Sequence, residues 1–263
     1  MSVRLVQCKS ARSRSRLPGL DWALNPYRGC EHGCAYCYAQ DVTRFETERP
    51  WGDRVEVKTN LVQRLKRELE VRADGVHGIG TVTDPYQPLE KKYELTRGSL
   101  AVLKRSGARI SILTKSDLVL RDIDILRSWP DAEVGMSVSC LSEGITEAIE
   151  PHAPSPSRRF RALAELSSEG ISVYVMFAPL IRGLCDSDED IRRVVRAAGE
   201  ASVKTIMWDK FNPKPMASSR LKNALVEKGI ESWTLHSSED LRRVRSTLAS
   251  EAESEGITVV EAF

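Results

Sequence analysis

Short apolar runs rich in β-branched residues alternate with longer amphipathic stretches along most of this chain. A strand buried on both faces of a parallel sheet is apolar at nearly every position, so each run predicts such a strand. We expect strands at 24–28, 76–81, 109–113, 133–138, 171–177 and 203–207.

The stretches between these runs have the spacing of helices with one buried face. In 60–72, for example, Leu61, Leu65 and Leu69 fall on one side of a helix. We expect helices at 60–72, 96–105, 119–128, 157–168, 188–200 and 218–228. This alternation predicts an α/β fold in which about six βα units form a partial (β/α)6 barrel of the TIM type.

No long linker or low-complexity tract divides the chain. We expect a basic arm at 1–20, the barrel core at 21–215, and a C-terminal α/β extension at 216–263 that packs on the core. The arm could contact phosphates, or it could be a solvated terminus with little order. It contains no acidic residue, and its basic residues are Arg4, Lys9, Arg12, Arg14 and Arg16.

The overall charge adds little to this picture. With 39 basic and 37 acidic side chains, the net charge of +2 neither requires nor excludes a nucleic-acid partner. No apolar run approaches the ~20 residues of a membrane span, and no apolar segment follows the first charges. We therefore expect a cytoplasmic protein without a membrane partner, whose six cysteines are reduced thiols.

Three of the cysteines, Cys30, Cys34 and Cys37, fall within one short segment with the spacing C-x3-C-x2-C. In a reducing compartment this clustering indicates metal binding. A compact loop with these gaps can bring three thiolates to three corners of a cubane cluster and leave the fourth iron open to a chelating molecule. A zinc site is the alternative, with a fourth ligand from Cys8, His32, Cys140 or Cys185, although none has a familiar zinc spacing.

The cysteine spacing, with Tyr36 before the last cysteine, resembles the signature of the radical S-adenosylmethionine (SAM) superfamily. The wider segment 25–40 resembles its spore photolyase-like branch, often called DNA repair photolyases. Segments 83–90, 113–116, 154–156 and 178–183 resemble that branch in the same order, so the resemblance covers roughly 20–215.

The resemblance implies a barrel of the radical SAM type, with a [4Fe–4S] cluster on the three cysteines and SAM on the open iron. A reduced cluster would cleave SAM, and the resulting 5′-deoxyadenosyl radical would abstract a hydrogen atom from the substrate. The cofactor carries this chemistry, while the protein supplies orientation and a dry site. An electron donor such as flavodoxin or ferredoxin is implied as a partner.

The resemblance also implies a SAM site at the strand ends. It places Lys115 on the SAM carboxylate, Ser137 and Ser139 near the carboxylate or the ribose, and Tyr36 near the adenine. Each has an ordinary alternative, namely a solvated lysine, serines at the edge of the core, or a tyrosine that closes its loop. Weaker matches are Gly80 and Thr83, which fit loosely to a Gly-rich segment that holds the SAM amino group, and Ile181, which matches a segment beside the adenine but which packing alone would explain nearly as well.

One departure from the branch concerns a hydrogen donor. Spore photolyase uses an additional cysteine to return a hydrogen atom to the product radical, and the resemblance places that position around 81–83. This chain has no cysteine between Cys37 and Cys140. Cys140 follows the fourth strand and could face the cavity as a catalytic donor, or it could be a buried structural cysteine.

Three functions remain open at this point. The first is a radical SAM enzyme that repairs or modifies a nucleic acid, which would require the target nucleotide to be extruded into the barrel. The second is a radical SAM enzyme that acts on a peptide or a small molecule, because the site rather than the fold decides the substrate. The third is a non-catalytic iron–sulfur or zinc protein that binds nucleic acid.

Overall fold

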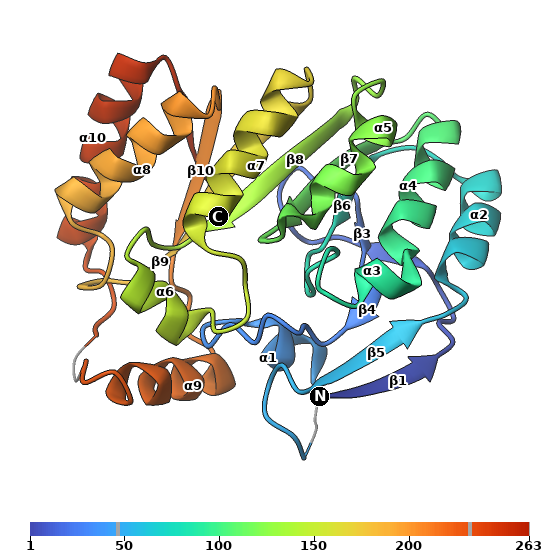
Figure 1. Ribbon diagram of the computed structural model, residues 1–263, viewed down its shortest axis with the longest axis horizontal. Helices are drawn as coiled ribbons and strands as arrows, with labels where there is room; N and C mark the ends of the chain where they lie inside the picture. Colours follow the sequence, from blue (N-terminus) through green and yellow to red (C-terminus); the bar gives the residue numbers. More distant parts are fainter. Residues whose placement is uncertain (46–47, 231–232, 263) are drawn as a thin grey trace.

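The structure is a computed structural model that describes residues 1–45, 48–230 and 233–262. It confirms the α/β fold, because its main feature is a curved sheet with helices along its outer face (Figure 1). Neighbouring strands are parallel, except for the antiparallel pair at one edge. The order of the strands is β11 (Thr258–Glu261), β10 (Thr205–Lys210), β9 (Ser172–Leu180), β8 (Ala132–Val138), β7 (Arg109–Thr114), β6 (Val76–Ile79), β3 (Trp22–Leu24) and β2 (Arg12–Arg14).

The two edges of this sheet do not pair with each other, so the barrel is partial, as expected. Helices connect the strands. They are α1 (Ala39–Thr43), α2 (Leu61–Val71), α3 (Glu90–Tyr93), α4 (Leu95–Arg105), a 3-10 helix (Asp117–Asp122), α5 (Ile123–Leu126), α6 (Glu143–Ile149), α7 (Pro156–Ser168), α8 (Asp188–Glu200), α9 (Pro215–Val226) and α10 (Ser238–Glu255).

The two faces of the sheet carry different side chains. On β8, Val134, Met136 and Val138 are fully buried in the main core, which also contains apolar residues of α7 and α8. The opposite face holds a smaller apolar cluster around Tyr174 and Met176. Gly135 is required there, because a Cβ at this position would lie 2.2 Å from the ring of Tyr174. This inner face also holds polar groups, since Ser111 Oγ and the Tyr174 hydroxyl lie 3.2 Å apart, within hydrogen-bond distance.

The predicted strand at 24–28 is divided between two sheets. Its first part is β3 of the main sheet, and its second part is β4 (Tyr27–Arg28) of a separate sheet with the order β1 (Ser2–Val6), β5 (Arg54–Lys58), β4. The first twenty residues consequently differ from the expected arm, because they contribute paired strands to both sheets. Arg12 is 6% exposed and contacts His77.

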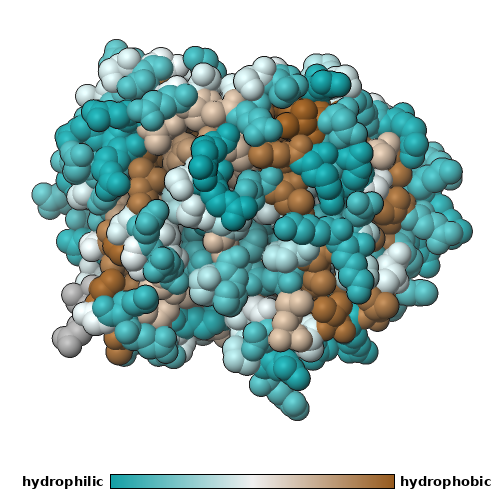
Figure 2. All heavy atoms as spheres, in the orientation of Figure 1, coloured by the Kyte–Doolittle hydropathy of each residue, from teal (hydrophilic) through white to brown (hydrophobic). Residues whose placement is uncertain are grey.

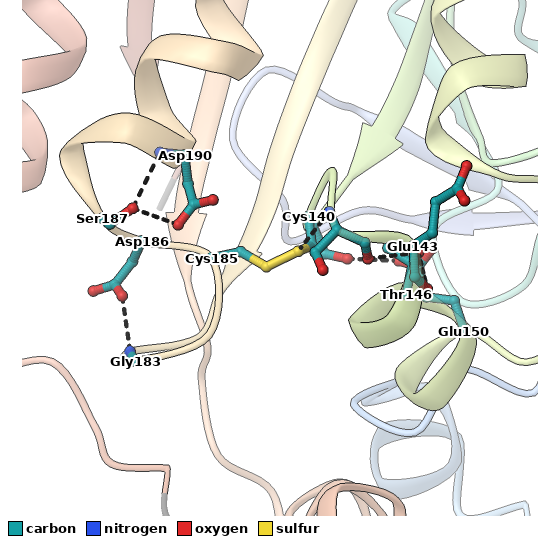
Figure 3. Close-up of a disulfide and its surroundings, with 11 residues drawn as sticks. Cys140, Glu143, Thr146, Glu150, Gly183, Cys185, Asp186, Ser187 and Asp190 are labelled. Carbon is teal, nitrogen blue, oxygen red and sulfur yellow. Dashed lines mark hydrogen bonds between the residues drawn. A yellow bond between two sulfur atoms is a disulfide. The ribbon is translucent and has the colours of Figure 1, made fainter. Parts of the chain in front are cut away.

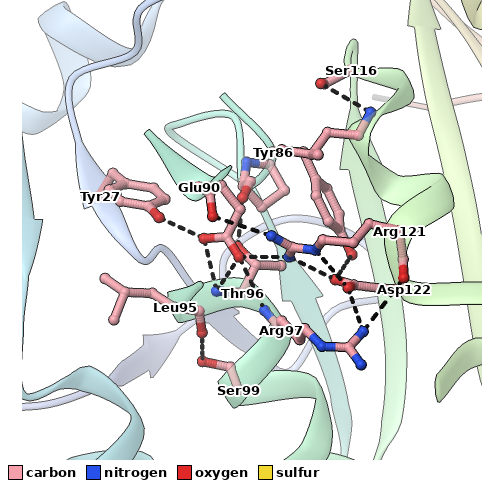
Figure 4. Close-up of polar contacts among 12 residues, drawn as sticks. Tyr27, Tyr86, Glu90, Leu95, Thr96, Arg97, Ser99, Ser116, Arg121 and Asp122 are labelled. Carbon is pink, nitrogen blue, oxygen red and sulfur yellow. Dashed lines mark hydrogen bonds and ion pairs between the residues drawn. The ribbon is translucent and has the colours of Figure 1, made fainter. Parts of the chain in front are cut away.

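Behind β4, Glu90 joins several elements through its fully buried carboxylate (Figure 4). It accepts hydrogen bonds from the Tyr27 hydroxyl at 2.5 Å, from the Thr96 backbone at 3.0 Å and from Arg121 at 2.9 Å. Because Thr96 lies in the first turn of α4, Glu90 satisfies a backbone donor at the start of that helix. This network ties the strand before the cysteine loop to the helical layer.

The elements after residue 215 contact the rest of the chain at three places. Strand β11 pairs with β10, α10 packs on α8, and α9 packs on α1 and α6. Most of the face in Figure 2 is hydrophilic, and its hydrophobic residues form separate groups. Among the helices of the described ranges, none is both long enough and apolar enough to cross a membrane.

Candidate active site

The three clustered cysteines lie in the loop between β4 and α1. Gly29 begins this loop with a φ of 86°, and a Cβ there would lie 2.4 Å from the carbonyl oxygen of Arg54. Only glycine allows the loop to approach β5 this closely. Backbone hydrogen bonds from Gly33 to Cys30 and from Cys37 to Cys34 then fold the segment on itself.

The thiols of Cys30, Cys34 and Cys37 are free and lie close enough to influence one another's ionisation. Burial raises the pKa of all three thiols, that of Cys34 to about 12, while the Lys115 ammonium opposes the shift at Cys34 and Cys37. These thiols are neutral without a metal, and coordination would deprotonate them. The donor set and the neighbouring cation therefore fit an anionic iron–sulfur cluster.

A single metal ion is a different case. In the described part of the chain, no three or more Cys, His, Asp or Glu side chains converge on a point that would hold one ion. A cubane cluster does not need such convergence, because its cysteines bind separate irons at its corners.

Lys115 follows β7, as predicted, and its backbone N–H donates to Asp84 at 2.8 Å. Burial lowers the pKa of its ammonium, but the nearby Cys34 and Glu150 raise it above the usual value. The Nζ atom lies 5.4 Å from the centre of the Tyr36 ring. Within the described residues it makes no hydrogen bond or ion pair, so this cation beside the cysteine loop is available to an anionic ligand.

Tyr36 and Ser139 meet at the carboxylate of Glu150, which ends α6. Glu150 accepts from the Tyr36 hydroxyl, from Ser139 Oγ at 2.8 Å, and from the buried guanidinium of Arg159. Burial raises the pKa of Glu150, but Arg159 and Lys115 outweigh it and lower that pKa to about 2. The predicted residues are therefore brought together by a carboxylate that the sequence did not single out, and their contact with SAM stays a prediction.

Two of the remaining predicted residues, Thr83 and Ile181, contact the cysteine loop. Thr83 Oγ1 donates to the carbonyl of Gly29 at 2.6 Å, so this hydroxyl positions the start of the loop. Gly80 has a φ of 93° and leaves no room for a Cβ against Pro85. Ile181 is buried in an apolar cluster with Cys34 and Tyr36. Ser137 is also buried, and its carbonyl accepts from Arg159 at 3.0 Å.

Cys140 forms a disulfide with Cys185, with 5.3 Å between their Cα atoms (Figure 3). The bond joins the end of β8 to the loop before α8. This corrects the expectation that every cysteine is a reduced thiol. It also means that Cys140 has no S–H to donate in this state, and its role as a hydrogen donor stays a prediction that requires reduction.

Sequence reasoning missed several charged residues that hold the site together. The side chain of Arg159 is 1% exposed, whereas that of the neighbouring Arg158 is 51% exposed and pairs with Asp117. Arg220 of α9 donates to the Cys37 carbonyl at 2.5 Å. No local signal marks these residues, because Glu150 and Arg220 contact residues of the cysteine loop that lie 114 and 183 positions away in the sequence.

The sequence model of the family described as "Radical SAM superfamily" matches residues 24–196. An uncharacterised protein of Methanocaldococcus jannaschii is 35% identical over 69% of this chain and 68% of its own length. An uncharacterised protein of Mycobacterium tuberculosis is 33% identical over 75% of this chain and 62% of its own length, so the chain spans about two thirds of these relatives. A radical SAM Nα-GlyT isomerase of Pseudomonas phage M6 is 26% identical over 64% of this chain and 35% of its own length.

Two solved structures show a similar fold. Spore photoproduct lyase with bound AdoMet and dinucleoside spore photoproduct has a TM-score of 0.72 at 16% identity, covering 98% of this chain and 81% of that one. Streptococcus suis SuiB bound to the precursor peptide SuiA has a TM-score of 0.64 at 14% identity, covering 91% and 48%.

Proposed function

This chain belongs to the radical SAM superfamily, and from that premise we propose that Cys30, Cys34 and Cys37 bind the [4Fe–4S] cluster of a radical SAM enzyme whose substrate is a nucleic acid. The superfamily uses this cluster together with SAM, so the chain is an enzyme and not only a binding protein. The cysteine ligands, the SAM contacts and the substrate are the parts that we propose.

When bound, the cluster supplies the electron that cleaves SAM and releases the 5′-deoxyadenosyl radical. The residues of this chain orient SAM for that step. Lys115 would bind the SAM carboxylate, and the observation that carries this assignment is its free ammonium beside Cys34. A lysine offers a compact charge that suits a carboxylate. Ser137, near the end of β8, and Ser139, just beyond it, would lie beside the same ligand.

Water must be kept from a radical at this site. The apolar cluster that contains Ile181, Tyr36 and Cys34 covers one side of the cysteine loop. Glu150 accepts hydrogen bonds from Tyr36 and Ser139, and Arg159 pairs with the same carboxylate, so neither of these two buried charges is left without a partner. The loop is therefore held in a rigid, largely dry setting.

The likeness to spore photoproduct lyase supports a nucleic-acid substrate, because that protein is described with a dinucleoside and the shared fold extends over 98% of this chain. SuiB is described with a peptide, and this chain spans only 48% of it. The likeness to spore photoproduct lyase covers more of both chains than the likeness to SuiB does, and this favours a nucleic-acid substrate. A flavodoxin or ferredoxin would supply the electron.

The reaction is tested by anaerobic reconstitution, addition of SAM and a reductant, and measurement of 5′-deoxyadenosine. We expect one oxygen-sensitive cluster per chain and production of 5′-deoxyadenosine, both lost when any of the three cysteines is replaced by alanine. A triple alanine variant that retained full iron and sulfide would refute the ligand assignment.

The substrate is tested with deuterated thymine-containing oligonucleotides and, separately, with deuterated peptides. We expect deuterium to appear in 5′-deoxyadenosine only with the oligonucleotide. Transfer from the peptide alone would reject the nucleic acid and support the second candidate.

A further inference from the structure

Arg220 reaches the cysteine loop from a part of the chain outside the family match. It lies on α9, whereas the match to the family ends at residue 196. Its guanidinium donates to the backbone carbonyl of Cys37 and to the side chain of Gln40, each at 2.5 Å. The C-terminal elements thus contact the last cysteine of the motif directly.

The position of Arg220 is fixed by a second contact between the same two segments. Asp41, in the first turn of α1, accepts hydrogen bonds from the backbone N–H groups of Met216 and Ala217 at 2.9 and 3.2 Å. N–H groups at the start of a helix have no partner within that helix. The Asp41 carboxylate satisfies two of them in α9 and interacts favourably with the helix dipole. Helix α9 is therefore anchored to the segment that follows Cys37.

The guanidinium has an unused donor at this place. Its Nε atom is buried and has no hydrogen-bond partner among the described residues, although such groups are nearly always paired. The charge of Arg220 interacts with Cys37 first, then with Asp41 and Cys34. A permanent positive charge thus lies close enough to the Cys37 and Cys34 thiols to interact with them.

We propose that Arg220 raises the reduction potential of the cluster through its positive charge. Reduction adds one negative charge to the cluster, so a neighbouring cation stabilises the reduced form more than the oxidised form. Hydrogen bonds to the sulfurs and net charge are established controls of such potentials. In this role Arg220 would not touch the substrate or the reacting atoms. The inference rests on the proposed assignment of the cluster to Cys30, Cys34 and Cys37.

The test compares Arg220→Gln, which removes the charge, with Arg220→Lys, which keeps it. Lys222→Gln, on the exposed side of the same helix, is the matched control for loss of one positive charge. Each full-length protein is reconstituted anaerobically and its iron and sulfide are measured. Its midpoint potential is then determined without SAM by a redox titration followed by electron paramagnetic resonance.

We expect Arg220→Gln to make one-electron reduction about tenfold less favourable, which corresponds to about 59 mV. Arg220→Lys should recover most of this change, and Lys222→Gln should match the unmodified chain. Equal potentials in Arg220→Gln and the unmodified chain, each with a full cluster, would overturn the inference. Loss of the cluster from both Arg220 variants would also overturn it, because the role would then be structural.

These outcomes differ from a failure of the proposed function. If Cys37→Ala kept a complete cluster with its original potential, the ligand assignment itself would be wrong. If the cysteine variants lost the cluster but Arg220→Gln left the potential unchanged, only the role of Arg220 would be rejected.

Discussion

The guanidinium of Arg159 donates to the carboxylate of Glu150 in the interior of the protein, where each side chain is only 1% exposed. The pair connects α7 to the end of α6. Because the same carboxylate accepts from Tyr36, the pair also holds the cysteine loop against the end of β8. A single buried ion pair therefore links the scaffold to the site.

Replacing Glu150 by glutamine should destabilise the protein strongly. The substitution leaves the Arg159 charge buried without its partner, and breaking such a pair costs about 3–5 kcal/mol. We expect a decrease of that size in the free energy of unfolding, measured by denaturant titration under anaerobic conditions. Glu147→Gln, at an exposed position of the same helix, should change it by less than about 0.5 kcal/mol. A Glu150 variant as stable as this control would contradict the prediction.

The same carboxylate predicts a pH dependence. Burial raises the pKa of Glu150, but Arg159 and Lys115 lower it from 4.5 to about 2. A carboxyl group whose pKa is lower in the folded than in the unfolded chain stabilises the fold fully above its unfolded pKa and loses that contribution as the pH falls through its folded pKa. We expect the unfolding free energy of the unmodified chain to fall more steeply between pH 4.5 and 2 than that of Glu150→Gln. Parallel curves would show that Glu150 does not cause the loss.

Lys115→Ala should weaken SAM binding while leaving the cluster in place. A hydrogen bond to a charged group contributes roughly 1.5–3 kcal/mol, so we expect the dissociation constant of SAM to rise by about ten- to a hundredfold. The constant is measured by equilibrium binding to the reconstituted protein, with iron content as the check on the cluster. Lys91→Ala, at an exposed position, serves as the control. An unchanged dissociation constant would remove Lys115 from the site.

The sequence predicted the central strands well, for a physical reason. Strands β7 and β8 are buried at nearly every position, and apolar residues such as Ile110, Ile112 and Val134 make their approximate bounds visible in the sequence. Strands β1 and β2 could not be found this way, because most of their side chains are exposed. Their pairing with distant strands gives them their conformation.

The candidate site shows the same division between local and distant information. The cysteine motif is local, and the family resemblance at the strand ends was enough to make Lys115 and Ser139 candidates. Glu150, Arg159 and Arg220 could not be selected, because their roles depend on contacts that only the folded chain creates. The hydrogen bond from Tyr36 to Glu150, for instance, joins residues 114 positions apart.

Cys140 leads to a last prediction, which concerns the hydrogen atom that a product radical must receive. No cysteine lies at 81–83, and Cys140 is bonded to Cys185, so the structure offers no S–H group at either position. With this disulfide intact, we expect SAM cleavage without clean conversion of a synthetic dinucleoside spore photoproduct to two thymines. Thiol alkylation and mass spectrometry report the state of the disulfide during the assay, and Cys185→Ala supplies a chain in which Cys140 is free. Clean conversion by the disulfide-bonded chain, abolished in Cys140→Ala, would show that the prediction is wrong.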